Sequence, residues 1–162
     1  MVSFREAAVE DPTAQSLLDE YFVSRARSFP VALGAYSTRF PSPAQFVPPR
    51  GVFLLVEQSA PAARNVGCGG IRMLDSDATQ RLRYEVKHLW LQPEVRGHGY
   101  GRALLAELER RAREFGASEL VLDTNASLEA AAGLYRSSGF AECPPYNDNP
   151  NATHWYAKAL TG

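Results

Sequence analysis

Apolar positions in the first half of the chain follow the periods expected for one helix and several strands. Asp11 and Pro12 form a helix-start signal, because aspartate caps free N–H groups and proline fits the first helical position. We expect this helix to run over about 12–28. The expected strands are Val2–Val9, Gly51–Gln58, Val66–Leu74 and Leu82–Leu91. Turn residues at 59–65 and 75–81 separate the last three strands, so the pattern predicts an antiparallel meander.

The second half of the chain alternates helices with strands. A helix is expected to open after Gly97–Gly101, with one apolar face formed by Leu104, Leu105, Leu108, Ala112 and Phe115. On the opposite face Glu107 and Glu109 each precede an arginine by four residues, and Gly116 ends the helix. The remaining expected elements are a strand at Glu119–Thr124, a helix at Leu128–Ser138 and a strand at Thr153–Leu160.

Composition and charge limit the kinds of protein and the partners that this chain can have. With 162 residues, 45% of them apolar and 22% charged, the chain fits one globular domain, which we expect to span 1–162. Seventeen basic and eighteen acidic residues give a net charge of −1. Nucleic acids and anionic membranes are usually held by a strong positive field. We therefore expect neither as a partner.

The N-terminus and the cysteines favour a cytoplasmic protein. Charged residues begin at Arg5, and no run of 18 apolar residues occurs, so we expect neither a signal segment nor a membrane span. Cys68 and Cys143 lie far apart and form no CxxC spacing, which predicts reduced thiols. The three histidines are scattered without a metal-ligand spacing, and we expect no metal site.

A glycine-rich turn between a strand and a helix is the main candidate for ligand binding. In Gly97–Gly101 (GHGYG) backbone N–H groups can converge on a phosphate at the start of the helix. A nucleotide P-loop would need Lys-Ser or Lys-Thr after the glycines, and neither is present. A dinucleotide site would need GxGxxG directly after a buried strand. Asp123 lies at a suitable distance for that site, but Pro93–Arg96 intervenes and the preceding strand carries charged residues.

A third kind of phosphate site fits better. Arg96–Gly101 (RGHGYG) resembles the (Q/R)xxGx(G/A) motif of the GCN5-related N-acetyltransferases, the GNAT family. Glu85–Glu94 (EVKHLWLQPE) is similar to that family's fourth strand, and Ala131–Phe140 (AAGLYRSSGF) to its AxxLYxxxGF signature. Two signatures at the family's spacing are specific, whereas the glycines alone would be weak evidence. The motifs cover about 85–140, and the order of the expected elements extends the resemblance over the chain.

The resemblance implies an α/β fold of the mixed, α+β kind. The sheet would be twisted, mixed and mostly antiparallel, with about six to seven strands and helices on both faces. The strand at Leu82–Leu91 would carry a β-bulge and splay from Glu119–Thr124, so that freed backbone groups could bind the pantetheine arm of acetyl-CoA (coenzyme A). The residues implied in cofactor binding are Leu89, Trp90, Leu91, Arg96, Gly97, His98, Gly99, Tyr100, Gly101, Arg102, Asn125 and Tyr135.

Two further expectations concern this cofactor site. Family members often carry an asparagine seven residues before the signature tyrosine, and this chain has Leu128 there. Either Asn125 replaces that contact or the contact is missing. Valine in place of Gly99 or Gly101 is expected to abolish acetyl-CoA binding and leave the fold intact, because a side chain would occupy the space of the pyrophosphate.

The implied reaction is acetyl transfer to an amine by direct attack in a ternary complex. Such a reaction needs an acceptor for the amine proton and a donor for the leaving thiolate. Glu85 is the candidate base, acting through water, and a solvated strand carboxylate is its alternative interpretation. Tyr135 is the candidate donor to sulfur, and a core tyrosine is the alternative. His88 and His98 are candidate proton shuttles, although His98 reads more simply as an exposed loop residue.

The acceptor is expected to be a small-molecule or peptide amine, and its identity stays open. Two segments are free to form its site, the proline-rich stretch Phe29–Arg50 and the turn Tyr146–Asn151, with ordinary loops as the alternative. The candidate substrate-binding residues are Tyr36, Phe40, Tyr146, Asn147 and Asn149. A non-catalytic acyl-CoA-binding module that senses the cofactor for a partner protein is the alternative to an enzyme, and a homodimer is possible.

Overall fold

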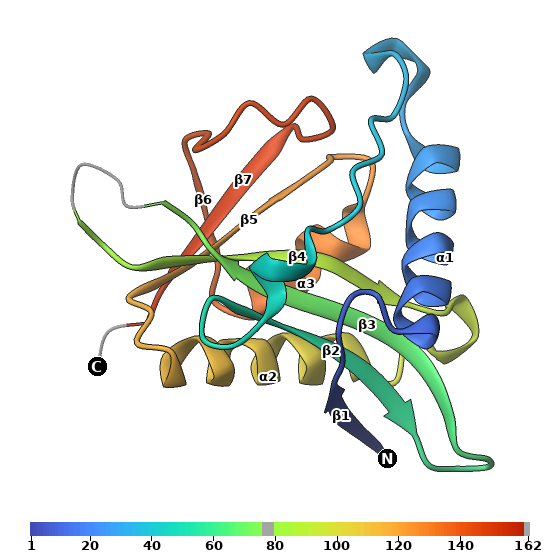
Figure 1. Cartoon of the computed structure of the whole chain (residues 1–162). Coiled ribbons are helices and arrows are strands. Elements are labelled where there is room, and N and C mark those ends of the chain that lie inside the picture. The colour runs from blue at the N-terminus through green and yellow to red at the C-terminus, as the bar shows by residue number, and fades with distance from the viewer. Residues whose placement is uncertain (76–79, 161–162) are drawn as a thin grey trace.

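The computed structural model describes residues 1–75 and 80–160, and Figure 1 shows a twisted sheet accompanied by helices. Of the turn expected at 75–81, residues 76–79 lie outside the described residues. The strands are β1 (Val2–Glu6), β2 (Gly51–Gln58), β3 (Arg64–Met73), β4 (Arg83–Leu91), β5 (Glu119–Thr124), β6 (Ala141–Cys143) and β7 (His154–Ala159). The helices are α1 (Pro12–Ser28), α2 (Tyr100–Glu114) and α3 (Glu129–Ser137), with short 3₁₀ helices η1 (Val31–Leu33), η2 (Pro43–Phe46) and η3 (Pro93–Val95).

One mixed sheet of seven strands organises the fold, in the order β1-β2-β3-β4-β5-β7-β6. All neighbouring strands are antiparallel except β4 and β5, which are parallel. This confirms the predicted fold class and the meander of β2, β3 and β4. The strand pattern did not predict β6 or the position of β7 between β5 and β6.

Two hydrophobic cores cover the two faces of the sheet. Along β2, Val52 and Leu54 belong to the core that contains the apolar face of α2, whereas Phe53 and Leu55 belong to the core beneath α1. All four side chains are almost completely buried. Because β2 is covered on both faces, its sequence is a continuous apolar run rather than an alternating one. The helices are thereby fixed on opposite faces, as predicted.

The ends of the helices follow the signals in the sequence. α1 has the predicted bounds, and the Asp11 Oδ1 atom caps it by accepting bonds from the N–H groups of Thr13 (2.8 Å) and Ala14 (3.3 Å). On α2 the predicted pairs form between Glu107 and Arg111 and between Glu109 and Arg113. In the described part of the chain, no helix combines the length and apolar character needed to span a bilayer.

Two irregularities in the strand pairing of β4 shape the region of the candidate site. β4 and β5 pair only from Arg83 to Glu85 on the β4 side, and Figure 1 shows the two strands fanning apart beyond this point. The pairing of β4 with β3 gains one residue on the β4 strand between Lys87 and Trp90. His88 lies in this bulge with φ +59°, a left-handed backbone conformation that is uncommon outside glycine. The predicted splay and the predicted β-bulge are both confirmed.

Candidate active site

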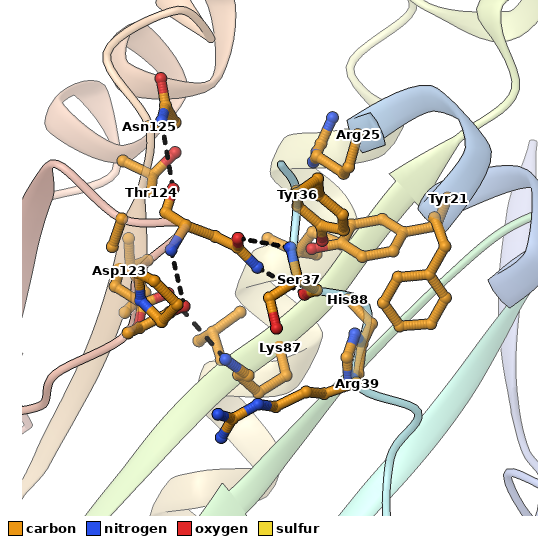
Figure 2. A pocket seen from close by; sticks show the side chains of 18 of the residues that line it. Tyr21, Arg25, Tyr36, Ser37, Arg39, Lys87, His88, Asp123, Thr124 and Asn125 are labelled. Atoms are coloured by element: carbon orange, nitrogen blue, oxygen red, sulfur yellow. Dashed lines mark hydrogen bonds and ion pairs between the residues drawn. The ribbon is translucent and has the colours of Figure 1, made fainter. Parts of the chain in front are cut away.

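A pocket of about 480 Å³ lies where β4 and β5 diverge. Its walls come from α1, the segment between α1 and β2, the ends of β4 and β5, α3 and the turn before β7. Figure 2 shows Tyr21 and Arg25 of α1 facing Asp123, Thr124 and Asn125 at the end of β5. Segments far apart in sequence therefore converge on one cavity of the size usual for small ligands.

The start of α2 offers free backbone donors beside this gap. Gly99 is the N-cap residue of α2, has φ +81°, and no side chain caps the helix there. The first N–H groups of a helix have no partner within it, and they attract phosphate together with the helix dipole. A Cβ atom at Gly99 would meet nothing within 4 Å, so the space in front of these donors is open. This geometry fits the pyrophosphate of coenzyme A.

Gly101 lies in different surroundings from Gly99, and the expected effect of valine at either position stays a prediction. A Cβ atom at Gly101 would lie 3.3 Å from Leu134 Cδ2 and 3.5 Å from Leu91 Cδ1. The residue faces the packing between α2, α3 and β4 rather than the space in front of the helix. A valine at Gly101 would crowd Leu134, and a valine at Gly99 would strain a backbone with φ +81°, so both variants need a check of folding beside the measurement of acetyl-CoA binding.

The remaining residues predicted to bind cofactor fall into two groups. Leu89, Asn125 and Tyr135 line the pocket, whereas Trp90, Leu91 and the Arg96–Arg102 segment lie outside its lining. Several of these groups already have partners. The Arg96 Nε atom donates to the Leu91 carbonyl (3.0 Å), and Arg102 donates to the Ser137 hydroxyl (2.9 Å).

Asn125 is also engaged within the protein. Its Nδ2 atom donates to the Asn151 carbonyl (3.1 Å), and its Oδ1 atom accepts from the Ser127 N–H group (3.0 Å). Leu128, which stands at the family's usual asparagine position, lines the same pocket. The amide of Asn125 thus holds the loop after β5, and its contact with the cofactor stays a prediction.

His88 brings an imidazole to the pocket from the bulge of β4. The side chain is 8% exposed and packs against the rings of Tyr21, Phe22 and Phe46. Burial, reinforced by Lys87 and Arg72, lowers the pKa of His88 to about 3, so the ring is neutral at physiological pH. Within the described residues its Nδ1 atom has no hydrogen-bond partner. His98, in contrast, is exposed and lies against Tyr100.

Tyr135 presents a phenol to the pocket from the C-terminal end of α3. The residue is 8% exposed, and its ring packs against Phe140 and Tyr156. Among the residues that the structure describes, its hydroxyl has no hydrogen-bond partner, and the residue lines the pocket. Burial raises the pKa of Tyr135 to about 12, so the phenol stays protonated and can donate.

Glu85 lies behind the pocket and is fully buried, so it is not a solvated strand carboxylate. Its Oε1 atom pairs with the guanidinium of Arg72, 2.8 Å from Nη2, and accepts a hydrogen bond from Nε at 3.0 Å. Its Oε2 atom accepts the Tyr146 hydroxyl at 2.6 Å and the Asn147 amide at 3.4 Å. The residue is absent from the pocket lining. These contacts describe a carboxylate that ties β3 and β4 to the turn before β7.

The candidate substrate-binding residues are largely brought together. Tyr36, Phe40, Asn147 and Asn149 all line the pocket, whereas Tyr146 points to Glu85 and does not. The Nδ2 groups of the two asparagines each donate a hydrogen bond to Asp123 Oδ2, at 2.7 Å and 3.2 Å. Tyr36 and Phe40 come from the proline-rich segment, and the ring of Phe40 packs on Phe22.

Sequence reasoning missed several residues of the pocket. Asp123 was considered only as a feature of a dinucleotide fold, although a carboxylate near the end of the apolar strand ELVLDT was a visible signal. Arg25 and Arg39 line the pocket but carry no local signal, because surface arginines occur throughout the chain. Asn151 binds both backbone groups of Ser37, at 3.0 Å and 2.7 Å, across a separation of 114 residues.

Comparison with known proteins agrees with this arrangement. The model of the acetyltransferase (GNAT) family matches residues 13–140. An IAA acetyltransferase of Azospirillum brasilense is 40% identical over 50% of this chain and 50% of its own length. An uncharacterized N-acetyltransferase of Schizosaccharomyces pombe is 32% identical over 65% of this chain and 61% of its own length. The matches thus span about half to three fifths of these relatives.

The fold is shared with solved structures as well. A GNAT family acetyltransferase from Elizabethkingia anophelis, with acetyl-CoA bound, superposes with a TM-score of 0.64 at 14% identity, covering 98% of both chains. This likeness shows that the two chains share one overall fold, a twisted sheet that in the present chain opens between β4 and β5. The chain belongs to the GNAT acetyltransferase family.

Proposed function

We propose that this protein is an acetyl-CoA-dependent N-acetyltransferase that acts on an amine by direct attack in a ternary complex. The observation that carries the proposal is the pair of features beside the gap between β4 and β5. The start of α2, which has no side-chain cap, packs near Leu91 and Leu134, and Tyr135, whose hydroxyl has no partner among the described residues, lines the amine pocket. A non-catalytic acyl-CoA sensor is not favoured, because it would have no use for that hydroxyl.

The residues of the chain divide the work of the reaction. Acetyl-CoA supplies the acetyl thioester. The amine nitrogen forms a C–N bond to the acetyl carbon and loses one proton, the C–S bond breaks, and the departing thiolate gains one proton. The α2 start would hold the pyrophosphate, and the β5-facing edge of β4 beyond Glu85 would hold the pantetheine amides. The hydroxyl of Tyr135 would donate to the leaving sulfur. No covalent intermediate is needed, because Cys68 is buried and its pKa is raised by burial.

Glu85 and His88 are the two residues to weigh as the base. Glu85, the candidate from the sequence, has both carboxylate oxygens occupied and does not line the pocket. Its contacts favour a positioning role, in which it orders Arg72 and the Tyr146–Asn147 turn. His88 does line the pocket, but a pKa lowered to about 3 makes its imidazole a weak proton acceptor near neutral pH.

Binding and turnover measured together would test the proposal. Calorimetry should show that acetyl-CoA binds, and mass spectrometry should detect N-acetylated product from at least one member of an amine panel. A protein that binds acetyl-CoA but acetylates no amine, peptide or free amino acid would be a sensor, and the proposed function would be wrong. The cytoplasmic location and the homodimer stay predictions, which cell fractionation and sedimentation would check.

A further inference from the structure

The charges that line the acceptor pocket are unbalanced. Four cations line it, Arg25, Arg39, Arg72 and Lys87, against two carboxylates, Asp123 and Asp148. Arg72 is neutralised from behind by Glu85. Lys87 lies between two carboxylates, 4.0 Å from Glu85 and 3.9 Å from Asp123. The charges that are left are the two arginines of α1 and the proline-rich segment, Arg25 and Arg39, and the single carboxylate of Asp148, so the excess is positive.

Neither of these arginines has an acidic partner within the described residues. The guanidinium of Arg25 lies over the Tyr21 ring, 4.8 Å from its centroid. Arg39 is exposed, lines the pocket and forms no hydrogen bond or ion pair with the described residues. In Figure 2 Arg25 is drawn close to Tyr36, and Arg39 is drawn below Ser37 and His88. Arginine forks suit carboxylates and related oxyanions, so these two side chains leave the pocket chemically ready for an anion.

The opposite wall suits an amine. Asp123 uses Oδ2 to accept both asparagine amides, and in the described part of the chain the nearest cation to Oδ1 is Lys87 at 3.9 Å. The imidazole of His88 lies in the same pocket and is neutral. Between the two walls the pocket carries aromatic rings, among them Phe22, Tyr36 and Phe40.

The pocket is also bridged. The side chain of Asn151 accepts the Ser37 N–H bond and donates to the Ser37 carbonyl, and both residues line the pocket. This pair joins the two loops that form the acceptor side. A cavity of about 480 Å³ spanned by such a bridge suits a compact molecule better than a peptide chain that must pass through.

We infer that the acceptor is a free amino acid or a close relative, with an apolar or aromatic side chain, whose anionic group is bound by Arg39 and Arg25 while its amine faces Asp123. The inference rests on the proposed function and specifies its substrate. It assigns the two arginines to acceptor recognition, not to coenzyme A, so they should affect KM for the acceptor and leave acetyl-CoA affinity unchanged.

Matched acceptors provide the test. Phenylalanine and leucine carry a free carboxylate next to the amine, and phenylalaninamide and leucinamide replace that carboxylate with a neutral amide. A phenylalanine tripeptide moves the carboxylate two residues away from the amine. We expect kcat/KM for each acid to exceed that of its amide and of the tripeptide by at least about tenfold, a factor that corresponds to about 1.4 kcal/mol. Arg39→Gln should raise KM for the acids about tenfold and leave the amides unchanged, and Arg25→Gln should act in the same direction.

Arg27→Gln is the control, since Arg27 is an exposed arginine on the same helix that does not line the pocket. Equal turnover of acids and amides would overturn the inference and leave the proposed function standing. So would a loss of acetyl-CoA affinity in Arg39→Gln, or a tripeptide that outperforms the free acids. An absence of turnover with every amine, despite acetyl-CoA binding, would instead refute the proposed function.

Discussion

The residue with the sharpest chemical prediction is Tyr135. The residue lines the pocket, its hydroxyl has no hydrogen-bond partner among the described residues, and its raised pKa keeps the proton on the phenol. Tyr135→Phe keeps the ring that packs on Phe140 and Tyr156 and removes only the donor. We expect kcat to fall by roughly ten- to a thousandfold, within or just below the range for general acid–base groups. Acetyl-CoA affinity and the melting temperature should change little.

Tyr156→Phe is the matched control for that variant. Tyr156 is equally buried, lies in the same aromatic cluster and does not line the pocket. Its loss of a hydroxyl should leave kcat near the wild-type value. If Tyr135→Phe turned over as fast as Tyr156→Phe, Tyr135 would be a packing residue and water would protonate the leaving group.

The variant Glu85→Gln distinguishes a catalytic role of Glu85 from a structural one. If Glu85 is the base, Glu85→Gln lowers the rate mainly at lower pH and leaves stability unchanged. The contacts with Arg72 and Tyr146 predict a different result. Gln cannot balance the Arg72 charge, and leaving a buried partner unsatisfied costs about 1–3 kcal/mol. We therefore expect Glu85→Gln to have a lower melting temperature and a pH–rate profile of unchanged shape. A shifted profile at unchanged stability would instead show that Glu85 acts as the base.

At the scale of elements, the bulge of β4 makes stability depend on pH through His88. The folded-state pKa is about 3, well below the value of 6.5 in an unfolded chain. As pH falls below 6.5 the unfolded state takes up a proton that the native state does not, so unfolding becomes easier. This contribution to stability is complete above pH 6.5 and is lost between pH 6.5 and 3, at up to about 1.4 kcal/mol per pH unit.

Denaturant unfolding between pH 5 and 7 would measure this effect. His88→Asn should flatten the pH dependence, since asparagine tolerates positive φ and does not titrate here. The variant should be less stable at neutral pH, because it loses the ring packed on Phe22 and Phe46. His98→Asn removes an exposed imidazole and should keep the wild-type slope. An equal slope in all three proteins would contradict the assignment.

The elements themselves were largely readable from the sequence, because their signals are local. Asp11-Pro12 marked the start of α1, and the continuous apolar run of β2 gave its bounds without error. β6 was missed because Ala141–Cys143 contributes only three residues, of which none is buried. The complete burial of Glu85 was not predicted, since Arg72 and Tyr146 lie 13 and 61 residues away and reach it only through the folded sheet.

At the scale of the whole molecule, the contact between Ser37 and Asn151 joins the first quarter of the chain to its end. It brings together two loops that are otherwise anchored to different elements, α1 and β7, and both loops form the acceptor side of the pocket. Only two hydrogen bonds form this contact, and each contributes about 0.5–1.5 kcal/mol. Such a contact is expected to open locally far more often than the sheet unfolds, and its opening would admit the acceptor.

Asn151→Ala tests this view, because it removes both bonds and leaves the sheet untouched. We expect the Ser37 amide to exchange its hydrogen about five- to tenfold faster, which follows from a loss of about 1 kcal/mol of local stability. Amides in β2 and β3 should keep their protection, and the melting temperature should shift little, since global unfolding is limited by the two cores. Asp148→Asn alters an exposed residue of the same turn and should leave Ser37 exchange as in the wild type. If Ser37 were equally protected in Asn151→Ala, the proline-rich segment would be held by its own packing, and acceptor entry would need a different route.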